Sequence, residues 1–154
     1  MPEEMITSVL FVCTANQCRS PMAEVMMRNW LEQKGRTGSW RVASAGIDAS
    51  PGIPATGTAQ RAMLERGIDL NHHRSQQVSE KLLAESDIIL VMEDWHKTQL
   101  LKEFPAYADK VCLIRERAGL QGDVDDPVGL PLDEYRKTAD ELQSLIITIF
   151  QEQL

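Results

Sequence analysis

Short runs of consecutive apolar residues alternate along the chain with longer segments in which apolar residues recur every third or fourth position. Residues 8–12 (Ser-Val-Leu-Phe-Val) and 87–92 (Asp-Ile-Ile-Leu-Val-Met) are nearly continuous apolar runs, a pattern typical of strands buried on both faces. Residues 40–45 and 111–115 have the same character. The pattern therefore predicts four strands.

The segments between these runs have the periodicity of amphipathic helices. In residues 22–34, Met22 and Met26 fall on one face, and Glu24 and Arg28 form an i,i+4 pair on the opposite, outer face. Further helices are predicted over residues 58–66, 79–85 and 95–104 and from Pro131 onward.

Strands that alternate with helices require crossover connections, which place parallel strands in one sheet with helices on both of its faces. The sequence therefore predicts an α/β fold, a three-layer sandwich around a four-stranded parallel sheet. No repeat, low-complexity tract or linker interrupts the pattern, so one domain is expected over residues 1–154. Ligands of such sheets bind beyond the carboxyl ends of strands, which is where residues 13–20 follow the first strand.

Composition narrows the range of partners. The chain has 154 residues, of which 43% are hydrophobic and 25% charged, values typical of a globular domain. A net charge of −7 disfavours nonspecific binding to nucleic acid or to an anionic membrane, and no apolar stretch is long enough to span a membrane. The first residues lack a signal-peptide pattern, and three cysteines are too few for a disulfide scaffold, so we expect a cytoplasmic protein.

The loop after the first strand has the residues of an anion site with a nucleophile. A loop that runs into a helix N-terminus can turn backbone N–H groups inward, and Arg19 adds a planar fork that holds two oxygens of a phosphate. The same positive surroundings favour the thiolate form of Cys13, which makes it a candidate nucleophile. Ser20 can donate a hydrogen bond to the sulfur, and Asn16 tolerates the left-handed backbone that a tight loop needs. The rest of the predicted phosphate-binding loop is Thr14, Ala15, Gln17 and Cys18.

Two further residues have both a chemical and a purely structural interpretation. Asp126 lies in a polar, Gly-flanked loop before a proline and can serve as a general acid, although an Asp-Pro pair is also common in turns. Cys18 lies five positions after Cys13; it is either a small packed residue or a resolving thiol that captures oxidised Cys13. His73 and His96 are interpreted as surface residues, and no spacing of histidines and cysteines indicates a metal site.

The segment from Cys13 to Pro21 resembles the signature loop of the low-molecular-weight protein tyrosine phosphatases, Cys-x-x-Asn-x-Cys-Arg-Ser-Pro. Segments 40–46, 67–72, 87–92 and 126–127 match the family in the same order, so the resemblance covers nearly the whole chain. The resemblance implies a protein phosphatase that needs no cofactor, acts on phosphorylated proteins and holds inorganic phosphate or another oxyanion in its loop. The implied roles are: nucleophile, Cys13; phosphate clamp, Arg19; general acid, Asp126; resolving thiol, Cys18; hydrogen-bond support of the loop, Asn16, Ser44 and His72.

Two departures from the family bear on the substrate. Val128-Gly129 follows Asp-Pro where many relatives have aromatic residues, and Gln17 stands where an apolar β-branched residue is common. Segments 122–129 and 133–142 resemble the bacterial protein arginine phosphatase branch, which shares Thr14 but has Thr at position 17. The substrate is therefore open between phosphotyrosine and phosphoarginine, with phosphotyrosine favoured because most of the family acts on it.

Two other functions fit the sequence less well. An arsenate reductase would need a resolving cysteine pair further along the chain, where Cys112 stands alone. A binding module without catalysis would not need Cys13, Arg19, Ser20 and Asp126 together.

Overall fold

Four parallel strands form the single sheet in the part of the chain that the computed structural model describes, residues 5–154. The strand order is β2-β1-β3-β4, with β1 paired to both β2 and β3. The expected domain begins at Met1, and residues 1–4 lie outside the described residues. The strands are β1 (Thr7–Cys13), β2 (Trp40–Gly46), β3 (Ile88–Val91) and β4 (Val111–Leu113).

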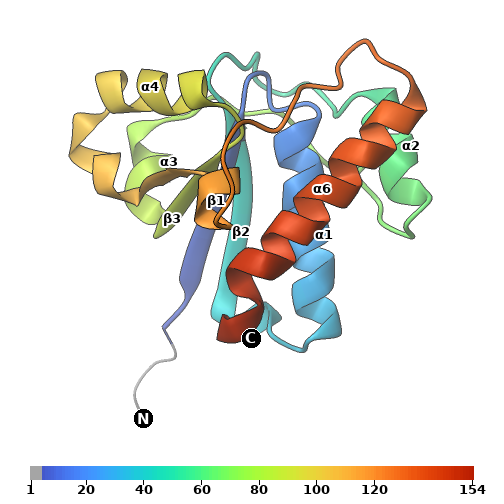
Figure 1. Ribbon diagram of the computed structural model, residues 1–154, viewed down its shortest axis with the longest axis horizontal. Helices are drawn as coiled ribbons and strands as arrows, with labels where there is room; N and C mark the ends of the chain where they lie inside the picture. Colours follow the sequence, from blue (N-terminus) through green and yellow to red (C-terminus); the bar gives the residue numbers. More distant parts are fainter. Residues whose placement is uncertain (1–4) are drawn as a thin grey trace.

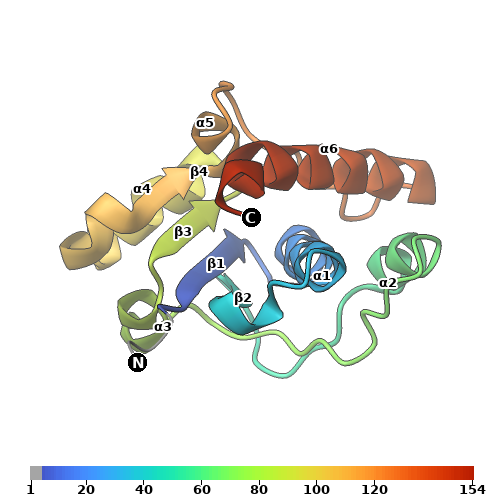
Figure 2. The ribbon, with the colours of Figure 1, turned by 90° about the horizontal axis from the view of Figure 1, so that it is seen from below.

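Helices cover both faces of this sheet, which confirms the predicted three-layer sandwich (Figure 1). Helices α1 (Arg19–Gln33), α2 (Gly57–Leu64) and α6 (Leu132–Phe150) lie on one side, with α3 (Glu80–Glu85) and α4 (Asp94–Glu103) on the other, as Figure 2 shows from below. The remaining helical elements are α5 (Ile114–Arg117) and the short 3₁₀ turns Thr37–Ser39, Pro105–Lys110 and Gln151–Gln153.

The alternation of β1 divides the core into two layers. Val9 and Phe11 face α1 and α6, whereas Leu10 and Val12 face α3 and α4, and all four are at most 1% exposed. Burying both faces explains why this strand is a continuous apolar run. It also fixes β1 rigidly in the middle of the sheet.

The fourth strand is shorter than predicted. The expected strand over 111–115 ends at Leu113, and Ile114 begins the helical turn α5. Ile114 is buried in the same core layer as α6, so its apolar character carries no information about strand or helix. Arg115 follows in the turn, where its Nε donates to the carbonyl of Gln121 at 2.8 Å and its guanidinium pairs with Glu141.

The loop over residues 14–18 leaves the carboxyl end of β1 at the switch point of the sheet. The chain passes from β1 to β2 on one side and later returns to β3 on the other, so crossovers diverge at this end of β1. Helix α1 begins at Arg19, three residues before the predicted start at Met22, which brings Arg19 and Ser20 into its first turn. None of the helices in residues 5–154 has the length and apolar character that crossing a membrane requires.

Candidate active site

Outward-pointing carbonyls shape the loop over residues 13–18. The carbonyls of Cys13, Thr14 and Gln17 accept hydrogen bonds from the backbone N–H groups of Ile47, Asp48 and Thr56 at 2.8–3.0 Å, and that of Cys18 accepts from Met22 at 3.1 Å. The carbonyl of Asn16 accepts from Nε2 of His73 at 2.7 Å. With its carbonyls tied to the surrounding chain, the loop presents the opposite, N–H side of its peptides to the interior of the loop, which is the arrangement of an anion cradle.

Two backbone features make this tight loop possible. Asn16 has φ 58°, the left-handed conformation predicted for it from sequence. Gly46, at the end of β2, lies against the loop so closely that a Cβ there would stand 2.6 Å from the Thr14 carbonyl oxygen and 3.0 Å from the Asn16 nitrogen. The loop therefore requires the absence of a side chain at position 46.

A chain of hydrogen bonds reaches the sulfur of Cys13 from inside the fold. The Asn16 carboxamide is oriented without ambiguity, because its oxygen accepts from the backbone N–H of Gln76 at 3.0 Å. Its nitrogen donates to Ser20 Oγ at 2.8 Å and to Ser44 Oγ at 2.9 Å. Since Ser20 Oγ accepts from Asn16, its own hydrogen is left to donate, and its two acceptors are Cys13 Sγ at 2.9 Å and the more distant Ala45 carbonyl at 3.4 Å. Ser20 can thus stabilise a thiolate on Cys13.

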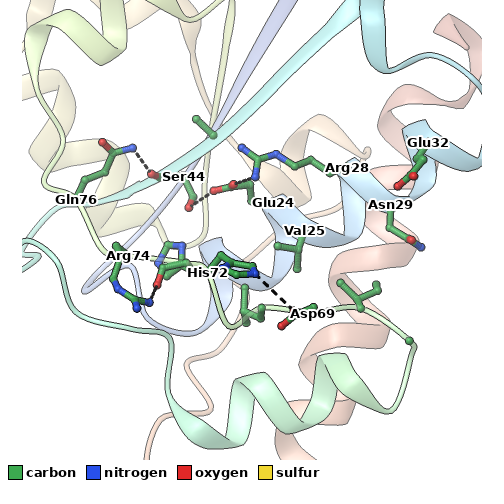
Figure 3. Close-up of a pocket in the computed structure, with 15 residues that line it drawn as sticks. Glu24, Val25, Arg28, Asn29, Glu32, Ser44, Asp69, His72, Arg74 and Gln76 are labelled. Atoms are coloured by element: carbon green, nitrogen blue, oxygen red, sulfur yellow. Dashed lines mark hydrogen bonds and ion pairs between the residues drawn. The ribbon is translucent and has the colours of Figure 1, made fainter.

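The hydrogen bonds that begin at Asn16 and Ser44 continue to two charged side chains that line a cavity. Ser44 Oγ donates to Glu24 at 2.6 Å, and Glu24 pairs with Arg28 at 2.6 Å. Both side chains line a cavity of about 610 Å³ between α1 and the segment from residue 67 to residue 76 (Figure 3). Glu24 is only 9% exposed, so it belongs to the support of the loop rather than to the outer face that the i,i+4 pattern indicated.

Arg19 is buried, and its shortest hydrogen bonds are made by Nη1. Its Nη1 donates to Glu93 at 2.8 Å and to the Val124 carbonyl at 2.7 Å, and the side chain is 1% exposed. This fixes the guanidinium plane and leaves Nε and one of the two hydrogens of Nη2 for a ligand. Nη2 lies 3.3 Å from Thr14 Oγ1 and 3.5 Å from Asp126 Oδ2. The two-pronged edge of Arg19 therefore faces the loop interior.

A pocket of about 200 Å³ brings the predicted reacting groups together. Its residues are Cys13, Thr14, Ala15, Gln17, Cys18, Arg19, Asp126 and Val128. The Asp126 side chain is 35% exposed at the mouth, and its Oδ1 accepts from the Val128 N–H at 3.1 Å. Asp126 therefore lines the same pocket as Cys13, although 113 positions separate the two residues in the sequence.

Cys18 shares the pocket but differs from Cys13 in its surroundings. Its sulfur lies 3.5 Å from the hydroxyl of Tyr135 and 3.6 Å from that of Thr56. Burial raises the pKa of the Cys18 thiol, and burial also raises the pKa of Tyr135 to about 12. Because burial outweighs the effect of these two hydroxyls, the thiolate form of Cys18 is disfavoured, which makes Cys18 a poor nucleophile.

Comparison with known proteins agrees with this geometry. Residues 8–154 match the family described as "Low molecular weight phosphotyrosine protein phosphatase". The chain belongs to that family. The protein-arginine-phosphatase of Bacillus subtilis is 42% identical over 139 residues, which are 90% of this chain and 91% of that protein.

Solved structures extend the match to three dimensions. A low-molecular-weight protein tyrosine phosphatase from T. tengcongensis is 43% identical with a TM-score of 0.90, covering 95% of this chain and 99% of that one. A Cys-to-Ser mutant of the YwlE arginine phosphatase with a phosphorylated active-site serine is 39% identical with a TM-score of 0.90, covering 95% of both chains.

One predicted support residue of this phosphatase is displaced by a single position. His72, which the resemblance placed against the loop, points away from it with a side chain that is 90% exposed, and its nearest charged neighbour is Asp69 at 3.9 Å. Its neighbour His73, interpreted as a surface residue, makes the hydrogen bond to the Asn16 carbonyl. His72 lies in a turn that is closed by the hydrogen bond from the His73 N–H to the Leu70 carbonyl at 3.2 Å, and the turn leaves the His72 side chain outside while His73 faces the loop.

Sequence reasoning also missed three site residues. Glu93 pairs with Arg19, His96 bonds to Thr14, and Gly46 makes room for the loop. His96, interpreted as a surface residue, is 0% exposed. All three residues lie at or just after the carboxyl end of a strand that pairs with β1. Residues in such positions lie at the same edge of a parallel sheet, and this could have identified them from the sequence. Within residues 5–154, no group of three or more histidine, cysteine or acidic side chains is arranged to hold a metal ion.

Proposed function

We propose that this chain is a protein phosphatase that removes the phosphoryl group from arginine side chains. The observation that carries the proposal is the pocket wall. Among the described residues that line the pocket there is no aromatic ring, and Gln17 supplies a carboxamide whose oxygen can accept from a guanidinium. A phenyl ring gains much of its binding from aromatic contacts, whereas a guanidinium needs polar partners. The 42% identity to a protein-arginine-phosphatase supports the same substrate.

In the first step the Cys13 thiolate attacks phosphorus, so that a sulfur–phosphorus bond forms as the phosphorus–nitrogen bond breaks. Negative charge on the phosphoryl oxygens is met by the loop N–H groups and by the free edge of Arg19. Asp126 gives its proton to the departing guanidine nitrogen. Ser20, whose hydroxyl lies 2.9 Å from the sulfur, stabilises the thiolate before attack.

In the second step water attacks the cysteinyl-phosphate. The carboxylate of Asp126 takes a proton from that water, the sulfur–phosphorus bond breaks, and Cys13 returns as a thiolate while inorganic phosphate leaves. Hydrogen-bonded Ser20 then stabilises sulfur as the leaving group. The trapped phosphoserine of the related arginine phosphatase supports a covalent route of this kind.

Phosphotyrosine is the second candidate, and the family description favours it. Aryl phosphates also have a good leaving group, so the same residues would cleave them. Arsenate reduction is named for a relative from Staphylococcus epidermidis that is 32% identical over 90% of this chain. Cys112 lies in β4, two strands away from the loop, so it is poorly placed as a third cysteine of a relay.

Matched peptides that differ only in phosphoarginine or phosphotyrosine test the proposal. We expect kcat/KM for phosphoarginine to be the higher by at least about tenfold, the scale of one well-made polar contact. Gln17→Ile and Val128→Tyr should both move the preference toward phosphotyrosine. A wild-type preference for phosphotyrosine would contradict the arginine assignment while leaving the catalytic residues in place.

A further inference from the structure

His96 is a buried histidine with both ring nitrogens engaged. It lies in the first turn of α4, where Nδ1 faces the backbone N–H of Glu93 at 3.0 Å. A backbone N–H can only donate, so Nδ1 must accept and carries no hydrogen. The ring hydrogen of the neutral imidazole is therefore on Nε2, which lies 2.9 Å from Thr14 Oγ1. The Glu93 carboxylate is 3.7 Å from Nε2, outside hydrogen-bond distance, so Thr14 is the acceptor.

The hydroxyl oxygen of Thr14 accepts two hydrogen bonds, which determines where its own hydrogen can point. Its oxygen receives one hydrogen bond from His96 and a longer one, 3.3 Å, from Nη2 of Arg19. A hydroxyl has two acceptor positions and one hydrogen, so both acceptor positions are taken and only the hydrogen is left to donate. Thr14 lines the pocket that also holds Cys13 and Asp126. The hydrogen is thereby available to a ligand in that pocket.

We propose that the Thr14 hydroxyl is a catalytic hydrogen-bond donor to a non-bridging oxygen of the transferring phosphoryl group, and that His96 is the positioning residue that fixes its direction. The inference rests on the proposed phosphatase function. It adds a side-chain donor to the backbone cradle, on the side of the pocket where Nη2 of Arg19 lies 3.5 Å from Asp126.

The imidazole of His96 can fix the direction of the Thr14 hydroxyl only while the ring is neutral. A proton on Nδ1 would face the Glu93 N–H and add a positive charge beside Arg19. Burial, and then the charge of Arg19, lower the pKa of His96 to about 3. The donor arrangement therefore stays the same across the pH range in which phosphatases are assayed.

A double-mutant cycle tests the pair. Thr14→Val removes the hydroxyl at nearly constant volume, and Thr14→Ser keeps it. His96→Asn retains a short amide oxygen for the Glu93 N–H but does not reach Thr14. Thr148→Val, on the exposed side of α6, is the matched control for loss of a threonine hydroxyl. Each protein is assayed for kcat and KM with an aryl phosphate, for inhibition by orthovanadate and by inorganic phosphate, and for Tm.

We expect Thr14→Val to lower kcat by at least about tenfold, with a smaller change in KM, because the contact forms with charge that develops during transfer. Orthovanadate, which adopts the transition-state geometry, should lose more affinity than phosphate. Thr14→Ser should recover most of the rate. In the Thr14→Val background, His96→Asn should cost less than about twofold further, although its effect on Tm persists.

Three results would overturn the inference. Thr14→Val could match the wild type, Thr14→Ser could fail to rescue, or the rate effects of the two substitutions could multiply as independent sites do. Each of these leaves the phosphatase assignment standing as long as the wild type is active. A wild type that cleaves neither aryl phosphate nor phosphopeptide would instead overturn the proposed function, and this inference with it.

Discussion

Replacing Gly46 by alanine adds one methyl group where the loop passes β2. In the present geometry that carbon would stand 2.6 Å from the Thr14 carbonyl oxygen, 2.9 Å from Ala49 Cβ and 3.0 Å from the Asn16 nitrogen. Carbon and oxygen atoms that do not bond pack at roughly 3.5 Å, so the loop must move by close to 1 Å. A displacement of that size at reacting groups costs about a hundredfold in rate.

We therefore expect Gly46→Ala to lower kcat/KM for an aryl phosphate by about a hundredfold while the protein remains folded. Gly38→Ala is the matched control, because a Cβ at position 38 meets no atom within 4 Å. Steady-state kinetics and circular dichroism on both variants provide the comparison. Activity of Gly46→Ala within about threefold of the control would show that the loop geometry is not set by this contact, and the reasoning would fail.

Three other predictions follow from the contacts of Arg19, His73 and His96. Arg19→Lys keeps the charge but loses the fork, so kcat/KM should fall at least about a hundredfold, and a loss of tenfold or less would assign most of the binding to the loop N–H groups. His73→Ala should lower activity and Tm, whereas His72→Ala should change neither; the reverse order would refute the placement in the structure. Because the pKa of His96 is lowered to about 3, the unfolded chain binds the proton first as pH falls, so stability should drop between about pH 6.5 and 3 by at most about 5 kcal/mol. Denaturant titrations of the wild type and His96→Asn across this range measure it, and equal pH dependence in both would exclude His96 as the cause.

The predictable part of the fold came from periodicity. The continuous run at 8–12 identified a strand buried on both faces, and the structure places it at the centre of the sheet. The spacing of Cys13 and Arg19, with the left-handed Asn16 between them, depends only on a local loop and was therefore accessible from sequence. Local patterns predict local geometry well when one short segment contains all the partners.

The parts that failed depend on contacts between distant segments. Glu24 and Arg28 have the spacing of a surface pair, and only the position of Ser44 on β2 reveals that Glu24 supports the loop. His96 lies 82 positions from Thr14, and only the parallel order of β1 and β3 brings α4 to the loop. Adjacent His72 and His73 have the same chemistry, so the choice between them depended on the backbone path alone.

The covalent intermediate on Cys13 is the central claim, and trapping it is the most direct measurement. The enzyme is mixed rapidly with a phosphoarginine peptide, quenched in alkaline denaturant during the first turnover and digested for mass spectrometry. The account predicts one phosphoryl group on Cys13, formed in a burst that matches the enzyme concentration and absent in Cys13→Ala, which has no side-chain nucleophile. A first-turnover burst of dephosphorylated peptide with Cys13 unmodified, or with the phosphoryl group on another residue, would contradict it.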